Sequence, residues 1–247
     1  STGGYRWLFI IDGISFCVFF LTIIFVIAET LPQGKEPTKL VGGYITALRD
    51  RRLLVYVMVN IILTVYISQT QTTLPLYFSN FVAQANARGF NPQVISTLFA
   101  WHLLMTVACQ IPILKFLHRF SHARSLMISG GFWALGFACI TLTGTVVSYQ
   151  LWWASLGLGL FALAIVAYTP TASALIADLA PATLRGVYTS INSLCWAVGY
   201  AVGPPLGGWA LDQSPQFAHN FWLGLAATVP LVWAILWWLE RLVRRTN

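Results

Sequence analysis

Long apolar runs separated by short polar stretches dominate the hydrophobic pattern of this chain. A helix needs about 20 mostly apolar residues to cross a bilayer. Seven runs reach this length, at approximately residues 5–28, 53–82, 93–114, 126–147, 151–177, 187–211 and 220–240. The pattern therefore predicts an all-α membrane protein with seven transmembrane helices.

Basic residues gather in alternate connections between these runs. Twelve of the 14 Lys and Arg residues fall on one side of a seven-span zigzag, namely Lys35, Lys39, Arg49, Arg51, Arg52, Lys115, Arg119, Arg124, Arg185, Arg241, Arg244 and Arg245. Only Arg6 and Arg88 fall on the other side. Because cytoplasmic loops are enriched in Lys and Arg, we expect an outer N-terminus and a cytoplasmic C-terminus, in a multi-pass protein of the plasma (inner) membrane.

Composition agrees with a lipid bilayer as the surroundings of most of the chain. Charged residues make up 9% and hydrophobic residues 57% of the sequence, whereas a soluble domain carries about 25% charge. The net charge of +7 is explained by membrane topology, so we expect no nucleic-acid partner. The four cysteines all lie within apolar runs and indicate no disulfide framework.

A linker separates the first span from the other six. Residues 29–52 mix charges with Pro32, Gly34 and Pro37, which is typical of a connecting segment. We therefore predict one transmembrane helix at 1–28, a central cytoplasmic linker at 29–52 and a six-helix unit at 53–247. The chain begins at Ser1 without a methionine or a signal peptide, so we expect a piece of a longer protein.

Polar side chains at membrane depth are candidates for function, because they are costly to bury in lipid. The span at 53–82 holds a dense group of them, and its candidate substrate-cavity residues are Tyr66, Gln69, Thr70, Gln71 and Thr73. Helical spacing places Tyr66, Thr70 and Thr73 on one face. We expect this face to line a small-molecule site, and ordinary hydrogen bonding between helices is the alternative.

Further candidates lie in three other spans. Trp101 and His102 are in the third span, where His102 could carry a proton or bond a neighbouring helix with equal weight. Asn192 and Trp196 are four apart in the sixth span and share a face, which suits either a ligand or packing. Asp12 is the one acid well inside a span; a carboxylate bonded near the outer interface is favoured over a proton-coupling role.

Residues 178–208 combine two charges with a glycine-rich helix. Asp178 and Arg185 flank the turn before the sixth span, where they could form a cytoplasmic gate or simply cap helices. The helix that follows contains Gly199, Gly203, Pro204, Gly207 and Gly208. Glycines four apart let two helices approach closely, so we expect a hinge or close-packing element.

These residues resemble a known family. The pattern Asp178-x-Ala-Pro181-x-x-x-Arg185-Gly186, followed by Gly199-x-x-x-Gly203-Pro204-x-x-Gly207-Gly208, looks like the major facilitator superfamily and is closest to its drug:proton antiporter branch. The opening Gly4-Tyr5-Arg6-Trp7-x-Phe9-x-x-Asp12 and the closing Glu29-Thr30-Leu31-Pro32 resemble the ends of helix 6 of that family. The resemblance covers the whole chain and implies helices 6–12, with the last six spans forming one half of the bundle.

The resemblance also implies a function for the parent protein. It implies proton-coupled efflux of small amphipathic compounds or drugs, with a small-molecule substrate, a coupling ion and the missing helices 1–5 as partners. One departure concerns the loop after the third span, where the family has Gly-x-Leu-x-Asp-Arg-x-Gly. Here Leu114, Phe116, His118, Arg119 and Ser121 occupy those places, and Arg119 alone matches, as a gate candidate.

Other classes of protein fit the sequence less well. A seven-helix receptor or sensor without transport activity fits the span count and is the main alternative. An enzyme is not expected, because the chain has no nucleophile elbow, no His-Glu-x-x-His and no paired intramembrane acids. No Walker motif, metal-ligand spacing or cofactor signature is present, so we expect no cofactor and no metal.

Overall fold

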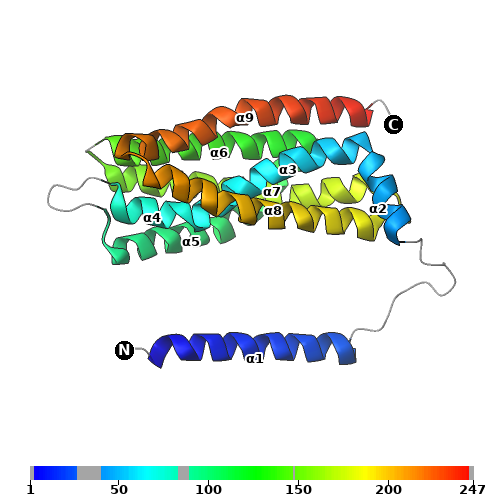
Figure 1. The fold of residues 1–247 in the computed structure, drawn as a ribbon, viewed down its shortest axis with the longest axis horizontal. Coiled ribbons are helices and arrows are strands. Elements are labelled where there is room, and N and C mark those ends of the chain that lie inside the picture. Colours follow the sequence, from blue (N-terminus) through cyan, green and yellow to red (C-terminus); the bar gives the residue numbers. More distant parts are fainter. Residues whose placement is uncertain (1–2, 27–39, 83–88, 147, 245–247) are drawn as a thin grey trace. The chain divides into compact units, whose positions relative to one another are not determined.

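Helices occupy all seven apolar ranges in the computed structural model, which describes residues 3–26, 40–82, 89–146 and 148–244 (Figure 1). In chain order they are α1 (Gly3–Val26), α2 (Leu40–Arg49), α3 (Arg51–Gln71), α4 (Thr73–Asn80), α5 (Pro92–Leu117), α6 (His122–Thr145), α7 (Gln150–Leu179), α8 (Arg185–Asp212) and α9 (Pro215–Arg244). Within these ranges the chain forms no strand. The predicted all-α membrane fold is confirmed.

Most of these helices have the length and composition of a membrane span. Five of them, α3, α5, α6, α7 and α9, are both long and apolar enough to cross a bilayer. Helix α8 has 28 residues, but its Asn, Ser, Thr and Gly residues lower its hydropathy. In α1 the apolar stretch within the described residues is shorter, Ile10–Thr22.

The chain divides into two units, Ser1–Thr38 and Lys39–Asn247, which are described separately. In the first unit, the side chains from Ile10 to Thr22 that the structure describes are exposed. Residues 27–39, which include 29–39 of the predicted linker, lie outside the described residues. The remainder of that linker contains the helix α2, so the domain boundaries proposed above stay predictions.

In the larger unit, successive long helices run in opposite directions and pack around an aromatic core. Helix α6 packs against α7 and α9, α3 packs against α8 and α9, and α5 packs against α7. At the centre, the ring of Phe161 lies 4.9 Å from that of Trp133 and 5.1 Å from that of Phe137, measured between centroids. Large buried aromatic rings of this kind contribute much of the packing energy of a core.

The second predicted span is built from two consecutive helices, α3 and α4, with Thr72 between them. Pro75 explains the break, because a proline ring clashes with the carbonyl of the residue four positions earlier, here Gln71. Thr72 satisfies the end of α3, since its backbone N–H and its hydroxyl both donate to the Ser68 carbonyl. The span is therefore interrupted next to the polar residues singled out above.

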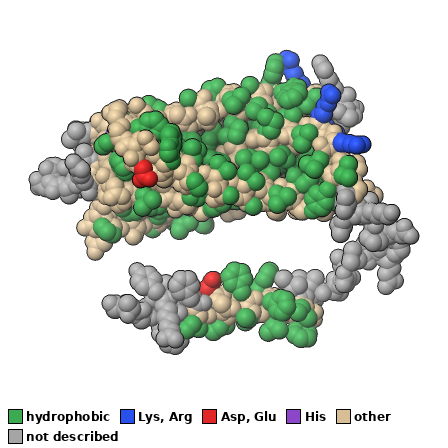
Figure 2. Space-filling view, in the orientation of Figure 1, with side chains coloured by type: hydrophobic (Ala, Val, Ile, Leu, Met, Phe, Trp, Pro, Cys, Tyr) green, Lys and Arg blue, Asp and Glu red, His purple; other side chains and the backbone are tan. Residues whose placement is uncertain are grey.

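Basic side chains gather at one end of the larger unit. Its described Lys and Arg residues are Arg49, Arg51, Arg52, Lys115, Arg119, Arg124, Arg185, Arg241 and Arg244, and all lie at or beyond helix ends on the side of α2 and the C-terminal end of α9. Figure 2 shows those visible on one face gathered at that end. We call it the basic end; Lys39, Arg88 and Arg245 of this unit lie outside the described residues.

Candidate functional site

Three glycines of α8 lie against α3 and the start of α4 with no space for a side chain. A Cβ atom at Gly203 would lie 1.8 Å from Ser68 Oγ, and one at Gly207 would lie 1.9 Å from Thr73 Oγ1. A Cβ at Gly199 would lie 2.3 Å from Thr64 Oγ1. These three glycines, four residues apart, let the two helices approach closely. By contrast, a Cβ at Gly208 would meet no atom within 4 Å, and Pro204 is only partly buried.

Three of the candidate cavity residues of α3 and α4 are hydrogen-bonded within the protein. The Gln69 amide nitrogen donates to the Gly203 carbonyl over 2.7 Å, and its amide oxygen accepts from the Thr73 hydroxyl over 2.5 Å. The Thr70 hydroxyl donates to the Tyr66 carbonyl over 3.3 Å. All three side chains are buried; the Gln69 bond joins α3 to α8, whereas the Thr70 and Thr73 hydroxyls bond residues four positions earlier in the chain.

Tyr66 points to a different neighbour. Its hydroxyl is hydrogen-bonded to Thr228 of α9, and its ring packs on Trp133 and Phe137 of α6. Helical spacing gives the face on which a side chain lies but not the helix that covers it, so Tyr66 and Gln69 contact different neighbours. The assignment of Tyr66, Gln69, Thr70 and Thr73 to a substrate cavity stays a prediction.

Asn192 lies in a network of amide and phenol groups that joins three helices. Its side-chain oxygen accepts from the Tyr56 hydroxyl over 2.5 Å and from the Asn60 amide over 2.9 Å. The Asn60 oxygen accepts from the Tyr168 hydroxyl over 2.6 Å. Sequence reasoning missed Tyr56 and Asn60, although their four-residue spacing in α3 was a signal that could have found them.

A row of aromatic side chains continues from this network along α8. Trp196 stacks on Tyr200 at a centroid distance of 6.1 Å and an interplanar angle of 18°, and it also contacts Tyr168 of α7 at 5.9 Å. We call Tyr168, Trp196 and Tyr200 the aromatic row. The Tyr200 hydroxyl donates to the exposed Gln71 amide over 2.8 Å. Asn192 and Trp196 thus lie on one face of α8, as their spacing predicted. The Asn192 amide lies at one end of the aromatic row and the Gln71 amide at the other.

Trp101 and His102 both donate to backbone carbonyls of α7. The Trp101 indole N–H donates to Ser155 over 3.1 Å, and His102 Nδ1 donates to Leu158 over 2.9 Å. His102 is 7% exposed. A cavity of about 840 Å³ beside Trp101 is walled by apolar and aromatic side chains, including Trp152 and Tyr149.

The gate candidates lie at the basic end, but they are not paired with each other. Asp178 Oδ2 lies 3.2 Å from His122 Nε2 of α6, with both side chains substantially exposed. Arg185 and Arg119 are exposed, and neither forms an ion pair with a residue that the structure describes. Asp12 is exposed in α1, in the other unit. The described residues bring no three metal-ligating side chains together.

Asp50 connects the start of α3 to α8 at the basic end. It caps α3 by accepting from the Arg52 backbone N–H over 2.9 Å, and it accepts from the Tyr188 hydroxyl over 2.9 Å. Burial raises the pKa of Asp50, but the hydrogen bonds from Tyr188 and Arg52 outweigh that effect and bring the pKa below its ordinary value of 3.8. Nearby, the Tyr44 hydroxyl of α2 lies 2.7 Å from the Ser190 hydroxyl of α8.

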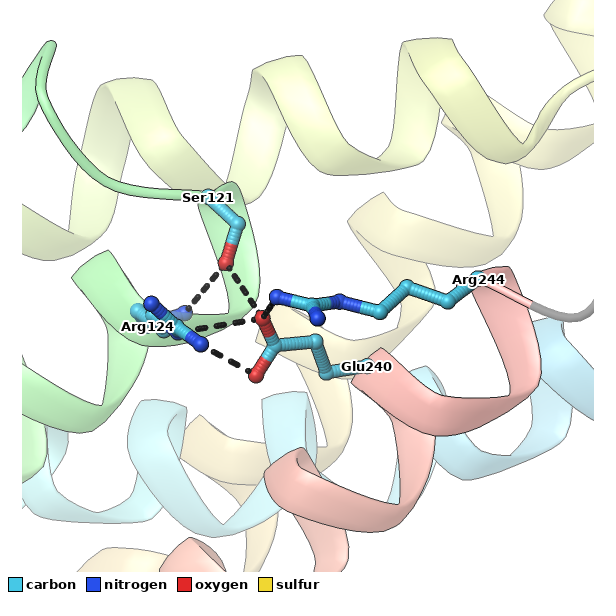
Figure 3. A network of polar contacts seen from close by, with 4 residues as sticks. All are labelled: Ser121, Arg124, Glu240 and Arg244. Atoms are coloured by element: carbon cyan, nitrogen blue, oxygen red, sulfur yellow. Dashed lines mark hydrogen bonds and ion pairs between the residues drawn. The ribbon is translucent and has the colours of Figure 1, made fainter. Parts of the chain in front are cut away.

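Glu240 forms a second polar network at the basic end, between α6 and α9 (Figure 3). Arg244 lies 2.8 Å and Arg124 lies 3.1 Å from its carboxylate, and the Ser121 hydroxyl donates to it over 3.2 Å. Sequence reasoning did not single out this acid. The sequence could have indicated it, because Glu240 is the one carboxylate of the last span and is followed by Arg241 and Arg244.

Comparison with known families matches this architecture. The family model of the Major Facilitator Superfamily matches residues 78–247, which is more than half of the chain. The chain belongs to the Major Facilitator Superfamily. The resemblance inferred from the motifs is therefore confirmed at the level of the superfamily, which is a family of transporters, and the receptor alternative has no support.

The proteins to which this chain is similar are about twice as long as the part that it matches. It is 24% identical over 211 residues to the uncharacterized MFS-type transporter YhjO of Bacillus subtilis (strain 168), covering 84% of this chain and 48% of that protein. A crystal structure of a POT family transporter in complex with 5-aminolevulinic acid matches at 18% identity and a TM-score of 0.62, covering 94% of this chain and 52% of that one. A second, with a thioalcohol-conjugated peptide, matches at 16% identity and a TM-score of 0.61. This superfamily chain thus spans about half the length of the relatives it matches.

Proposed function

We propose that this chain is the C-terminal part of a secondary active transporter that exports small amphipathic compounds in exchange for protons. Superfamily membership supports the transport role. The coverage of about half of each relative supports a missing partner, which would be helices 1–5 of the same protein. Alternating access would then rock the six-helix half against that partner around a site near the midplane.

The substrate surface of this half is proposed to be Trp196 and Tyr200 of the aromatic row, backed by the buried Tyr168, together with Asn192 and Gln71. Partial exposure of Trp196, Tyr200 and Asn192 supports this role, because side chains that are only partly covered can still contact a ligand. Aromatic faces bind planar apolar groups, and the flanking amides offer hydrogen bonds that fix orientation. This uncharged aromatic and amide surface is the observation that carries the proposal. Tyr66, Gln69, Thr70 and Thr73 would support it from behind, and Trp101 would flank it.

Proton coupling is proposed to involve His102, with Asp12 as the second candidate. Because Nδ1 of His102 donates to the Leu158 carbonyl, Nε2 is left as the nitrogen that can take up a proton. Asp12 is an exposed acid within an apolar helix, which is costly in lipid unless the acid is protonated or partnered. Other coupling acids are expected in the helices that precede this chain.

A cytoplasmic gate is proposed at the basic end, with Asp178, Arg185 and Arg119 as its members. The exposed pair of Asp178 and His122 contributes only about 0–1 kcal/mol, so Asp178 could leave His122 for another partner when the gate opens or closes. Arg185 and Arg119 are free to bind acids of the other half. The basic end would face the cytoplasm of a cell whose inner membrane holds the protein.

The proposed function is tested with the full-length protein in proteoliposomes. We expect ethidium, a planar aromatic cation, to be transported when a proton gradient is imposed and transport to stop when an uncoupler is added. Transport that continues unchanged with the uncoupler would contradict proton coupling. If none of a panel of amphipathic dyes moves under either condition, efflux of such compounds is excluded as the function.

A further inference from the structure

Two arginines pair with a single glutamate at the α6–α9 seam of the basic end, and a third arginine follows that glutamate in α9. Arg124 and Arg244 are paired with Glu240, and Arg241 extends from the same turn of α9. We call Arg124, Arg241 and Arg244 the seam arginines. Glu240 is only 8% exposed, so its charge is matched by its two partners, and the group as a whole keeps a net charge of two positives.

The two paired guanidinium groups retain unused donors. Arg124 contacts Glu240 through Nε, and Arg244 contacts it through one Nη atom. A guanidinium carries five N–H donors in a fixed fork, so several remain on each arginine. The side chains of Arg124 and Arg244 are 53% and 64% exposed. Glu240 therefore holds two arginines in place (Figure 3), and because both side chains are more than half exposed, their remaining donors are accessible.

Exposed tryptophans lie directly next to these arginines along α9. Trp237 and Trp238 are each 51% exposed, and the Arg241 guanidinium carbon lies 3.3 Å from the centre of the Trp237 ring. Tryptophan is enriched where the hydrocarbon core of a bilayer meets the headgroups. The change from tryptophan to arginine within one turn of α9 thus fits the depth of the headgroup phosphates.

A cavity extends from this cluster into the end of the bundle. Its volume is about 450 Å³, and its walls include Ser121, Glu240, Arg244 and Val243, with Arg52 from α3. Both polar and apolar side chains line it, which fits a group that carries charge at one end and hydrocarbon at the other. A free inorganic anion would use only the polar part of this wall.

We propose that the seam arginines bind the phosphate of an anionic phospholipid from the adjacent membrane leaflet, with its glycerol and acyl region against the exposed Trp237 and Trp238. Charge complementarity selects the anionic headgroup, since basic pockets between membrane helices on the cytoplasmic side bind such lipids. The site lies between α6 and α9, away from the aromatic row of α8. It does not depend on which compound the protein transports.

The test measures lipid binding to the purified, delipidated full-length protein by native mass spectrometry. Phosphatidylglycerol and phosphatidylcholine with identical acyl chains are compared, and we expect the wild type to retain the anionic lipid preferentially. Removal of a basic residue near the membrane surface weakens binding about fivefold. The double substitution R124Q/R244Q should therefore reduce phosphatidylglycerol retention by more than tenfold and leave phosphatidylcholine retention unchanged.

Two further variants keep the proposal falsifiable. R124Q/R244Q also removes both partners of Glu240 and could prevent folding, whereas R241Q leaves the Glu240 network intact and should lower phosphatidylglycerol retention about fivefold. K115Q removes an exposed base at the same membrane level on α5 and should leave retention unchanged. Equal losses in R241Q and K115Q would mean that general surface charge attracts the lipid, and the proposal would be wrong.

The source of the phosphate is decided by competition. Glycerol 3-phosphate and inorganic phosphate are added to the wild-type complex with phosphatidylglycerol. We expect neither to displace the lipid, because neither contacts the tryptophan side chains. Displacement by either soluble phosphate would show a site for free anions and would overturn the assignment to a lipid. Equal retention of phosphatidylcholine and phosphatidylglycerol would overturn the site itself.

Discussion

Trp196 is the residue on which the proposed substrate surface depends most. It contacts Tyr200 on one side and Tyr168 on the other, and it remains partly exposed. An aromatic pair contributes about 0.5–1.5 kcal/mol beyond the area that it buries. We expect Trp196→Ala to raise the KM of ethidium transport about tenfold. The matched control is Trp209→Ala, which removes an exposed tryptophan of the same helix outside the aromatic row and should leave KM unchanged.

His102 allows a separate test of coupling. An asparagine at this position can donate to the Leu158 carbonyl but cannot take up a proton. His102→Asn should therefore abolish transport driven by a pH gradient, while substrate exchange without a gradient continues. His219→Asn serves as the control, because His219 bonds Tyr77 on α4 instead. If His102→Asn retains gradient-driven transport at the wild-type rate, His102 has only a structural role.

Asp50 predicts a pH dependence of stability. Its pKa in the folded protein lies below 3.8, so the folded state favours the carboxylate, and the stabilisation is complete above that pH. The stabilisation is lost as the pH falls through the lower, folded-state pKa. Asp50→Ala should reduce stability by about 1–2 kcal/mol near neutral pH. The difference in melting temperature between the two proteins, measured in detergent, should shrink as the pH falls below 3.8 and should be constant above it.

At the scale of elements, the α3–α8 contact depends on the absence of side chains from α8. A methyl group at Gly203 would overlap Ser68 Oγ, and overpacking of this kind costs about 1–3 kcal/mol. We expect Gly203→Ala to lower the melting temperature and to slow transport. Gly208→Ala, in the same helix with nothing within 4 Å of its Cβ, should be neutral or slightly stabilising, because alanine favours helix.

Ser68 provides a check on the mechanism of this effect. Ser68→Ala removes the oxygen that the new methyl group would overlap, so the double variant should recover part of the stability lost in Gly203→Ala. No recovery would mean that the helix requires a glycine at 203 for another reason, such as bending near Pro204.

The helices themselves could be predicted from the sequence, and their neighbours could not. Runs of apolar residues give the positions of α3 to α9 because every span must be apolar along its length. Which face of a span contacts which helix depends on packing between residues that are far apart in sequence, as with Ser129 and Ala164, 35 positions apart, or Gln69 and Gly203, 134 positions apart. Gln69 shows this: its polarity suggested a cavity, yet its amide is bonded to Gly203 of α8. The Asp178–His122 pair was unforeseen for the same reason.

For the whole molecule, the distribution of charge is the strongest guide to orientation. The described Lys and Arg residues of the larger unit all lie at the basic end, on four different connections or termini. Such agreement among separate segments is what the positive-inside rule requires of a multi-pass protein. The side on which the basic residues lie could be predicted from the sequence, because that prediction needs only the order of the spans and not how they pack.

The orientation can be tested by labelling single cysteines in a cysteine-free background of the full-length protein, in intact cells, with a membrane-impermeant maleimide. Lys115→Cys places the thiol at the basic end, on the exposed end of α5, and should be protected from the reagent until the membrane is permeabilised. Gln213→Cys places it at the opposite end, in the exposed turn between α8 and α9, and should react at once. The reverse pattern would invert the topology, and it would move the proposed gate and the seam arginines to the outer surface, where the cytoplasmic leaflet cannot reach them.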